Sequence, residues 1–397
     1  MVLTLAERSK LIAPSATLAM AAAAKRLKAE GRDVLDFALG EPDFPTPANI
    51  QEAAIRAMRD GKTHYTPPAG IPELKAALAS HYSAQHGLEV KPDQVVVSNG
   101  AKQSIHNALM ALCGPGDEVI IPAPYWVSYS DLVKLTGATP VIIETTEADG
   151  FKLTPKRFLQ AVTPNTRLLM INSPSNPTGV VYERSELEAL ADAVLTTDAG
   201  VLSDEIYEQL CYGDAAPTCF ATLRPGLADR TVTISGVSKT YAMTGWRIGW
   251  AVSPPNVAKF MTDIQSQETS NPCSVSQYAA LEAVVGPQDS VKAMHAEFAK
   301  RRAFVLSRVE RLPGVTCVPP GGAFYAFLNV SSYFGKTLAG KPVTDSTSFC
   351  LTALNEAGVA LVMGSAFGTE GFARMSFATD LATLERGFDA MEKFLAS

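Results

Sequence analysis

Between residues 94 and 254, short apolar runs alternate with segments of helical patterning, and this alternation constrains the fold most strongly. The runs are rich in Val, Ile and Leu and read QVVVSN, EVIIP, TPVIIE, RLLMIN, VLSDEIY, TVTISG and RIGWAVS. Strands that are apolar on both faces and joined by helices form a mostly parallel sheet with helices on both sides. We therefore predict an α/β fold, with helices over 102–112, 126–135 and 183–195 among those flanking the central sheet.

The segments on either side of this region predict a second, smaller α+β domain. We expect its strands in GGAFYAFLNV, VALVMG and FARMSFA. Outside residues 94–254, in either domain, we expect helices over 17–30, 48–60, 71–86, 291–312 and 381–395 and one further strand over 34–40. The expected division is a large domain over 46–295 and a small domain formed by 1–45 together with 296–397.

Composition and charge exclude several classes of protein. Of the 397 residues 47% are hydrophobic and 19% are charged, so the chain can bury a large core and is not globally disordered. A net charge of −6 argues against nucleic acid or an anionic membrane as the main partner. No apolar run reaches the about 18 residues that span a bilayer. Glu7, Arg8 and Lys10 interrupt the stretch where a signal peptide needs apolar residues, so we expect a cytoplasmic protein.

Cysteine and glycine patterns exclude other kinds of site. The six cysteines are scattered, without a CxxC pair, and we expect them to be reduced and mostly buried, with no metal site. No GxGxxG motif follows a strand, which leaves a dinucleotide-binding enzyme without support. The segment GKTLAGK over 335–341 is close to a phosphate-binding loop, but Pro342 stands where Ser or Thr would hold Mg²⁺. We interpret it as a chance match.

The segment ISGVSKTYAMTGWRIGW, residues 234–250, carries the strongest functional signal. Lys239 and Arg247 are its only charged residues. Most lysines are solvated, but a buried lysine has a lowered pKa, and its neutral amine can form a Schiff base. Arg247 lies between Gly245 and Gly249, where its guanidinium could pair with a phosphate.

This segment resembles the cofactor-lysine signature of the class I and II aminotransferases, which are pyridoxal 5′-phosphate (PLP) enzymes of fold type I. The shared pattern is a small residue and Lys, followed by Gly-x-Arg-x-Gly. The resemblance implies that Lys239 holds PLP covalently, that Ser238 lies beside the cofactor and that Arg247 binds its phosphate. The chain departs from many relatives in having Gly236 where they have Ser.

Two further motifs match the family in order and spacing. SNGAKQSI places Gly100, Ala101 and Lys102 at the start of a helix, where free N–H groups suit a phosphate. By resemblance these three residues form the phosphate-binding turn. PAPYWVSY places Trp126 where relatives stack an aromatic ring on the pyridine, although an isolated Trp more often packs in a core.

The next two motifs supply polar groups for the cofactor ring. NSPSNPTG contributes Asn176, and VLSDEIYEQL contributes Asp204 within a strand and Tyr207 at its end. A buried carboxylate needs a cationic partner or a strong hydrogen bond. The resemblance implies that the protonated pyridine nitrogen is the partner of Asp204 and that Asn176 and Tyr207 contact the 3′-oxygen. It also implies cis peptide bonds at Ala123–Pro124 and Asn176–Pro177.

The resemblance also indicates the substrate. Arg374 in FARMSFA would grip the substrate α-carboxylate, together with the N–H of Gly40, with Trp126 and Asn176 also touching the substrate. The motifs PSAT, GIPEL, SDEIYE and AMTGWRIG are similar to those of one bacterial aspartate aminotransferase subgroup, in which a lysine and hydroxyls read the distal carboxylate. The matching residues in this chain are Lys102, Ser15 and Thr17.

The activity implied is transfer of the amino group of L-aspartate to 2-oxoglutarate, which gives oxaloacetate and L-glutamate. Tyr65 matches a tyrosine that relatives send into the neighbouring subunit's phosphate site, so a homodimer with shared sites is expected. The alternative is an aromatic or broad-range aminotransferase, including prephenate, with a β-lyase further behind. Ala13 stands where prephenate-aminating members have a basic residue, which disfavours that activity. A transcription regulator of this fold would need a DNA-binding domain ahead of residue 14.

Overall fold

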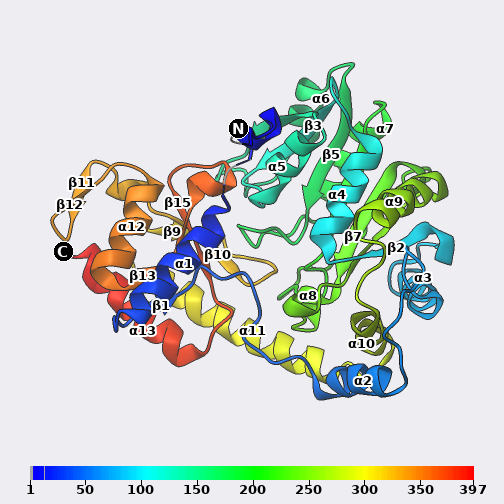
Figure 1. The fold of residues 1–397 in the computed structure, drawn as a ribbon. Helices are drawn as coiled ribbons and strands as arrows, with labels where there is room; N and C mark the ends of the chain where they lie inside the picture. Colours follow the sequence, from blue (N-terminus) through cyan, green and yellow to red (C-terminus); the bar gives the residue numbers. More distant parts are fainter. Residues whose placement is uncertain (1–2, 13) are drawn as a thin grey trace.

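The computed structural model describes residues 3–12 and 14–397, and within it the chain forms two parts (Figure 1). The larger part holds a seven-stranded sheet, and the smaller part holds a four-stranded sheet with its own helices. The long helix α11 (Asp289–Val309) leads from the larger part into the smaller one (Figure 1).

The seven-stranded sheet is mostly parallel, as predicted. Its order is β2 (Val95–Ser98), β8 (Gly249–Val252), β7 (Thr231–Gly236), β6 (Gly200–Asp204), β5 (Thr166–Asn172), β3 (Glu118–Ala123) and β4 (Thr139–Glu144). Only β8 runs antiparallel to its neighbours, β2 and β7. The other strands therefore present their carboxyl ends at one edge.

Helices cover both faces of this sheet. One face packs against α4 (Ala101–Leu112), α5 (Ser128–Leu135) and α9 (Pro255–Glu268). The other packs against α3 (Pro72–His86), α6 (Pro155–Ala161), α7 (Arg184–Leu195) and α10 (Ser274–Val285), and α2 (Ala48–Arg59) lies on α10. Within β5, Leu168 and Met170 face the first layer while Leu169 and Ile171 face the second. Burial on both sides explains why these strands show no polar–apolar alternation.

The smaller part combines the two ends of the chain. Its antiparallel sheet has the order β14 (Val362–Met363), β15 (Phe372–Ser376), β10 (Tyr325–Asn329) and β9 (Thr316–Cys317). A second sheet pairs β1 (Leu35–Asp36) with β13 (Val359–Ala360), so the N-terminal segment joins C-terminal elements. Its helices are α1 (Ala16–Ala29), α12 (Ser346–Ala357) and α13 (Leu381–Leu395).

Some local predictions differ from the structure. The strand expected over 34–40 is only the two residues of β1, because the rest of that segment runs past the cavity described below. The helix expected from 126 begins at Ser128, and Trp126 precedes it. The segment 335–341 belongs to a hairpin of β11 (Lys336–Leu338) and β12 (Lys341–Val343), so it is not a phosphate-binding loop.

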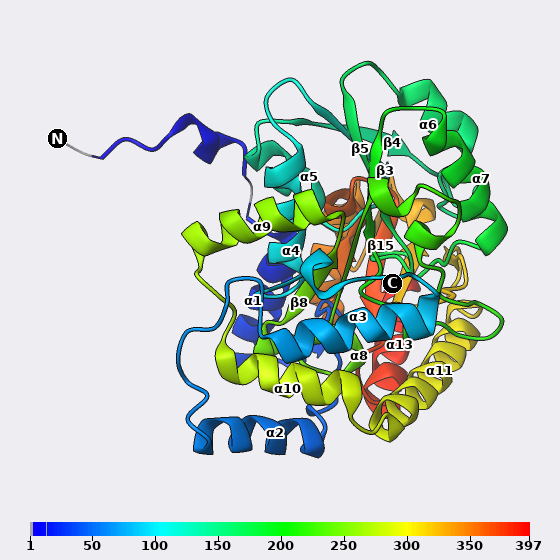
Figure 2. The ribbon, with the colours of Figure 1, turned by 90° about the vertical axis from the view of Figure 1, so that its right-hand side faces the viewer.

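The N-terminal segment projects away from the body of the protein (Figure 2). Residues 3–12 are all exposed, and they include Leu3 and Leu5. None of the helices in the described ranges is long and apolar enough to cross a membrane.

All six cysteines are free, as predicted, but they are less buried than expected. Cys219 and Cys350 are buried, and Cys273 is exposed. The remaining three, Cys113, Cys211 and Cys317, are half-buried. The prediction that most are buried was therefore wrong.

Candidate active site

A cavity of about 420 Å³ opens at the carboxyl ends of β5, β6 and β7. Asn172 and Asp204 end adjacent strands and are paired in register, and Lys239 follows the end of β7. Parallel sheets commonly bind ligands at this edge. The smaller part closes the cavity with Gly40, Tyr325 and Arg374.

Most residues predicted from the sequence line this one cavity. They are Ser15, Thr17, Gly40, Ala101, Lys102, Trp126, Asn176, Asp204, Tyr207, Ser238, Lys239, Arg247 and Arg374. Two predicted residues do not line it. Gly100 packs against the guanidinium of Arg247, and Tyr65 is 89% exposed.

Lys239 lies in the short helix α8 (Val237–Thr240), which the chain forms immediately after β7. Its Nζ donates a 2.6 Å hydrogen bond to the carbonyl of Gly40. Burial lowers the pKa of Lys239 to about 8, and the positive charges of Arg374 and Arg247 act in the same direction, against Glu41 and Asp204. The neutral amine is therefore populated at a much lower pH than in a solvated lysine, as expected from the sequence.

Asp204 is a buried carboxylate at the end of β6. Its Oδ2 accepts a 2.6 Å hydrogen bond from the hydroxyl of Tyr129, and its Oδ1 accepts one from the N–H of Ile206 at 3.2 Å. Burial nevertheless raises the pKa of Asp204 to about 6, because these bonds and the charge of Lys239 only partly offset the loss of hydration. The carboxylate thus faces the cavity without a full counter-charge.

Arg374 links the two parts of the protein at the cavity. It lies on β15 with 1% of its surface exposed, and its Nη1 donates to Asn176 Oδ1 at 2.9 Å. Its Nη2 donates to the carbonyl of Ala38 at 2.6 Å. Its Nε is buried and has no hydrogen-bond partner in the described chain. Because burial lowers the pKa of Arg374, the site favours binding of an anion here.

The opposite end of the cavity gathers positive charge at the start of α4. Gly100 caps this helix with φ of 84°, and a side chain there would overlap the guanidinium of Arg247. On the other side, a Cβ on Gly249 would overlap the backbone N of Ala101. These glycines bring Arg247 and the first N–H groups of α4 together, which is an arrangement that binds phosphate.

Lys102 and Trp126 form the outer wall. The Nζ of Lys102 lies 4.9 Å from the centre of the Trp126 ring, and burial together with Arg247 lowers the pKa of Lys102. Ser15 and Thr17, at the start of α1, line the same cavity. Ala13 falls outside the described residues.

Tyr207 differs slightly from its prediction. The strand β6 ends at Asp204, so Tyr207 lies in the turn beyond the strand and not at its end. This turn directs its hydroxyl to the hydroxyl of Tyr325, 2.9 Å away. A Cβ on Gly40 would lie 2.8 Å from that same Tyr325 hydroxyl, so a larger residue at position 40 would not fit.

Sequence reasoning missed several residues that line the cavity, among them Tyr129, Tyr325 and Asn172. Tyr129 and Tyr325 stand in the quoted segments PAPYWVSY and GGAFYAFLNV, but both also read as core aromatics. Asn172 ends RLLMIN, and its Oδ1 accepts from the N–H of Asn176 at 2.8 Å. A polar residue at the end of an apolar parallel strand was the available signal.

Two details of the backbone bear on the predictions. The peptide bonds Ala123–Pro124 and Asn176–Pro177 are cis, as predicted, and Ser173–Pro174 is cis as well. At Gly236 a Cβ would lie 2.9 Å from the Cα of Gly249 on the adjacent strand. This close approach explains why Gly236 has no side chain here.

Comparison with known proteins agrees with this geometry. Residues 32–391 match the family model of class I and II aminotransferases. The chain is 48% identical to an aspartate/prephenate aminotransferase of Cereibacter sphaeroides over 97% of both chains. It is 46% identical to an aspartate aminotransferase of Geobacillus stearothermophilus over 98% of both.

A solved structure of an aspartate aminotransferase from Rhizobium meliloti superposes with a TM-score of 0.96 at 41% identity, covering 100% of this chain and 99% of that one. The predicted type I fold is thereby confirmed. With its mostly parallel sheet, its smaller α+β part and a family match over most of its length, the chain belongs to the class I and II aminotransferases.

Proposed function

We propose that the cavity binds PLP and that the protein transfers the amino group of L-aspartate to 2-oxoglutarate, giving oxaloacetate and L-glutamate. The observation that carries this proposal is the convergence of Lys239, Asp204 and Arg374 on one cavity. An amine, a carboxylate and a guanidinium, each poorly compensated in charge, suit a ligand that is itself an amino acid bound beside a cationic ring.

The residues present fit PLP. Asp204 would face the pyridine nitrogen, whose proton would supply the missing counter-charge and bring the pKa of Asp204 down. Arg247, Ser238 and the turn of Gly100, Ala101 and Lys102 would hold the phosphate. When bound, PLP supplies a carbonyl carbon that reacts with amines and a ring that accepts the electron pair released at Cα.

Lys239 would both attach the cofactor and move the proton. Its lowered pKa leaves a substantial neutral fraction near pH 8. Its Nζ could therefore accept the proton from the substrate Cα and deliver it to the reactive carbon of the cofactor. Asn176 and Tyr207 would contact the 3′-oxygen. Enclosure by Tyr325 and Arg374 from the smaller part would keep water from the proton transfers.

Arg374 would bind the α-carboxylate of every substrate. Its two terminal nitrogens are fixed by Asn176 and Ala38, and its Nε has no partner, so the guanidinium is already oriented before an anion arrives. The backbone N–H of Gly40 would assist it, with Trp126 and Asn176 also in contact.

The distal carboxylate of aspartate would bind at the outer wall. Lys102 supplies a charge there, and Ser15 and Thr17 supply hydroxyls on the same cavity. The names of both relatives above include aspartate, which supports a dicarboxylate substrate.

We also infer a homodimer with two domains per chain. Tyr65 is almost fully exposed and lies outside its own cavity, which suits a residue that enters the neighbouring site. Leu3 and Leu5 on the projecting segment are apolar and exposed, as expected of residues that a partner covers. The domain division at 45/46 and 295/296 would make α11 the hinge, because the second boundary falls within it.

The test is a substrate panel on the purified protein. With 2-oxoglutarate as acceptor, kcat/KM for aspartate is expected to exceed that for phenylalanine, and Lys102→Ala is expected to lower the value for aspartate more than for phenylalanine. Equal or better use of phenylalanine would overturn the aspartate assignment, while Lys239→Ala should abolish both reactions.

Prephenate is the second candidate acceptor, because a relative 48% identical over 97% of both chains is named for it. The test uses aspartate as donor and prephenate in place of 2-oxoglutarate. Turnover comparable to that with 2-oxoglutarate would establish the second activity, and none would limit the protein to the first.

A further inference from the structure

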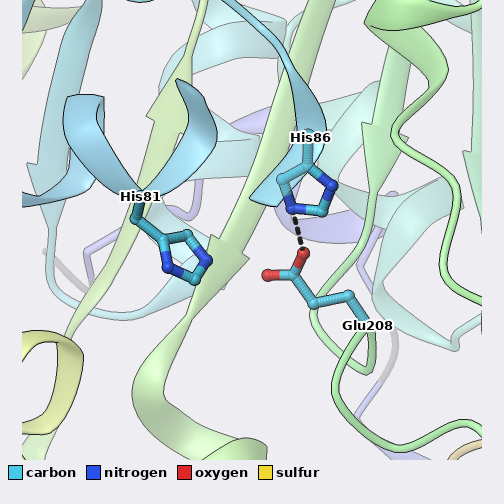
Figure 3. A group of neighbouring side chains, drawn as sticks. All are labelled: His81, His86 and Glu208. Atoms are coloured by element: carbon cyan, nitrogen blue, oxygen red, sulfur yellow. Dashed lines mark ion pairs between the residues drawn. The ribbon is translucent and has the colours of Figure 1, made fainter. Parts of the chain in front are cut away.

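A cluster of His81, His86 and Glu208 lies outside the lining of the active-site cavity and has no part in the proposed reaction (Figure 3). Both histidines belong to α3, and His86 is the last residue of that helix. Glu208 lies in the segment after β6 that also carries Tyr207. The cluster therefore joins a surface helix of the larger part to the chain that lines the active site.

The three side chains present metal-binding atoms to one another. One imidazole nitrogen of each histidine and one carboxylate oxygen lie within 4.8 Å of each other. Figure 3 shows the carboxylate of Glu208 between the two rings, with His86 Nε2 2.9 Å from Glu208 Oε2. This contact occupies one nitrogen of His86 and one oxygen of Glu208, and a metal ion would replace it by binding the same two atoms.

The surroundings orient the carboxylate and leave an entry path. The hydroxyl of Ser235 donates to Glu208 Oε1 at 2.9 Å and fixes one oxygen. Such a second contact is typical of carboxylates that bind metals. His81 is partly exposed, so an ion could reach the cluster from the α3 side, and a fourth position would remain for water.

The charge balance also favours a cation. Glu205 and Glu208 are both buried, and no Lys or Arg of the described residues forms an ion pair with either. Among the described residues, His86 is the one that forms an ion pair with Glu208.

We propose that His81, His86 and Glu208 bind one divalent transition-metal ion, of which zinc fits best. Two imidazoles and one carboxylate are a ligand set that zinc uses, with an open fourth position. Zinc bonds of about 2.0–2.2 Å put tetrahedral ligands roughly 3.4 Å apart, so the half-exposed His81 ring need only turn inward. The ion would tie α3 to the Tyr207 segment and stabilise the folded enzyme.

The site could not be predicted from the sequence. His81 and His86 are five apart on one helix, which is not the four-residue spacing of a helical metal pair. Glu208 is more than a hundred residues away and lies in a motif that the active site explains.

The experiment uses the PLP-loaded enzyme, stripped with a chelator and then dialysed against micromolar free zinc. One zinc per chain is expected, together with a rise in the thermal unfolding midpoint. His81→Gln is the primary variant, because it removes one ligand and leaves the buried His86–Glu208 contact in place. It should weaken zinc binding by at least about tenfold, since even outer contacts of a metal cost that much, and should remove the rise in midpoint.

His106→Gln is the matched control, because His106 Nε2 also lies near a glutamate, 3.3 Å from Glu268 Oε1 on another face. It should bind zinc as the parent does. Glu208→Gln should lose binding as His81→Gln does. Absence of bound zinc in the parent, or equal binding by the parent and His81→Gln, would overturn the proposal. So would loss of binding in His106→Gln alone. None of these outcomes depends on the substrate, so they do not test the aminotransferase assignment.

Discussion

The residues that define the site share one physical property: each is a charged side chain buried where water cannot stabilise its charge. Lys239 has its pKa lowered to about 8, and Asp204 has its pKa raised to about 6, both chiefly by burial. Arg374 is almost fully buried and has an unpartnered Nε. Under the proposed function, these costs would be relieved when a cationic ring and an anionic substrate bind.

Asp204→Asn tests this cost at a single residue. Because the folded-state pKa is raised from 3.8 to about 6, the penalty is absent below the unfolded value and fully present above about pH 6. Asparagine keeps an acceptor for Tyr129 but carries no charge. The variant without PLP should therefore unfold with a free energy higher by up to about 3 kcal/mol at pH 8, and the gain should shrink towards pH 4.

Urea unfolding of both proteins at several pH values, with and without PLP, measures this difference. In the loaded enzyme the gain should vanish or reverse, because the ring compensates Asp204, and turnover should fall by orders of magnitude. A gain independent of pH would contradict the assigned cause.

Tyr129→Phe tests the hydrogen bond that orients Asp204. Phenylalanine keeps the ring beside Trp126, 5.4 Å between centroids, but removes the donor to Oδ2. A hydrogen bond to a charged group contributes about 1.5–3 kcal/mol, so PLP affinity should fall about tenfold or more. Equilibrium dialysis of PLP gives the value.

The control is Tyr333→Phe, which removes a hydroxyl that donates to the Pro313 carbonyl in the smaller part. It should lower stability and leave PLP affinity unchanged. Equal losses of affinity in the two variants would show that Tyr129 acts on folding alone.

At the scale of single residues, the sequence located those in motifs and missed those whose role comes from packing. Asp204 and Lys239 were predictable because each is a charged residue within or next to an apolar strand, where it needs a partner, and because each stands in a motif of the family. Tyr129 and Tyr325 were not, because a buried tyrosine in an apolar segment reads as core until its hydroxyl partner is known.

The elements position the site through close approach of backbones. Strand β8 runs beside the first turn of α4, and a Cβ on Gly249 would overlap the N of Ala101. Arg247 lies two residues before Gly249, at the end of the turn that leads into β8. The contact at Gly249 therefore sets the distance between Arg247 and the N-terminus of α4. The end of the cavity that we propose for the phosphate is thus built by backbone packing.

Gly249→Ala should therefore destabilise the protein by about 1–3 kcal/mol, the usual cost of overpacking, and weaken PLP binding as well. The matched control is Gly245→Ala four residues earlier, where nothing lies within 4 Å of a Cβ. Its effect on unfolding should stay within about 0.5 kcal/mol. Urea unfolding measures both, and equal stability of the two variants would contradict the close approach.

The sequence predicted the central elements well, because strands buried on both faces and their helices have distinct patterns. It did not predict that β8 is antiparallel, since strand direction depends on the connection and not on composition. The seven residues expected for the first strand reduce to β1 because the backbone after Asp36 turns to the cavity, where Ala38 and Gly40 serve Arg374 and Lys239.

On the scale of the whole molecule, the site draws on both parts of the chain, and we infer that it also draws on a second chain. The small and large parts meet at Arg374, whose partners Asn176 and Ala38 come from distant segments. Tyr65 is too exposed to serve its own cavity. Local sequence patterns show neither the partners of Arg374 nor the exposure of Tyr65, and Tyr65 was predicted only through resemblance.

Mixing two inactive variants tests the shared site. A mixed dimer contains one Lys239→Ala chain and one Tyr65→Ala chain. The site of the Tyr65→Ala chain then has its own intact Lys239 and receives an intact Tyr65 from the partner, whereas the other site lacks both. Mixed dimers, formed by refolding together, should regain about one parental site per dimer, whereas each variant alone stays impaired. If mixing restores nothing beyond the sum of the two, Tyr65 does not serve a neighbouring site.

The most direct measurement of the central claim locates the cofactor on the chain. The purified enzyme is reduced with borohydride, which fixes PLP to the amine that holds it, and the digested peptides are sequenced by mass spectrometry. The account predicts one modified residue, Lys239, in the peptide that follows β7. Modification at Lys102 or another lysine, with Lys239 unmodified, would contradict it.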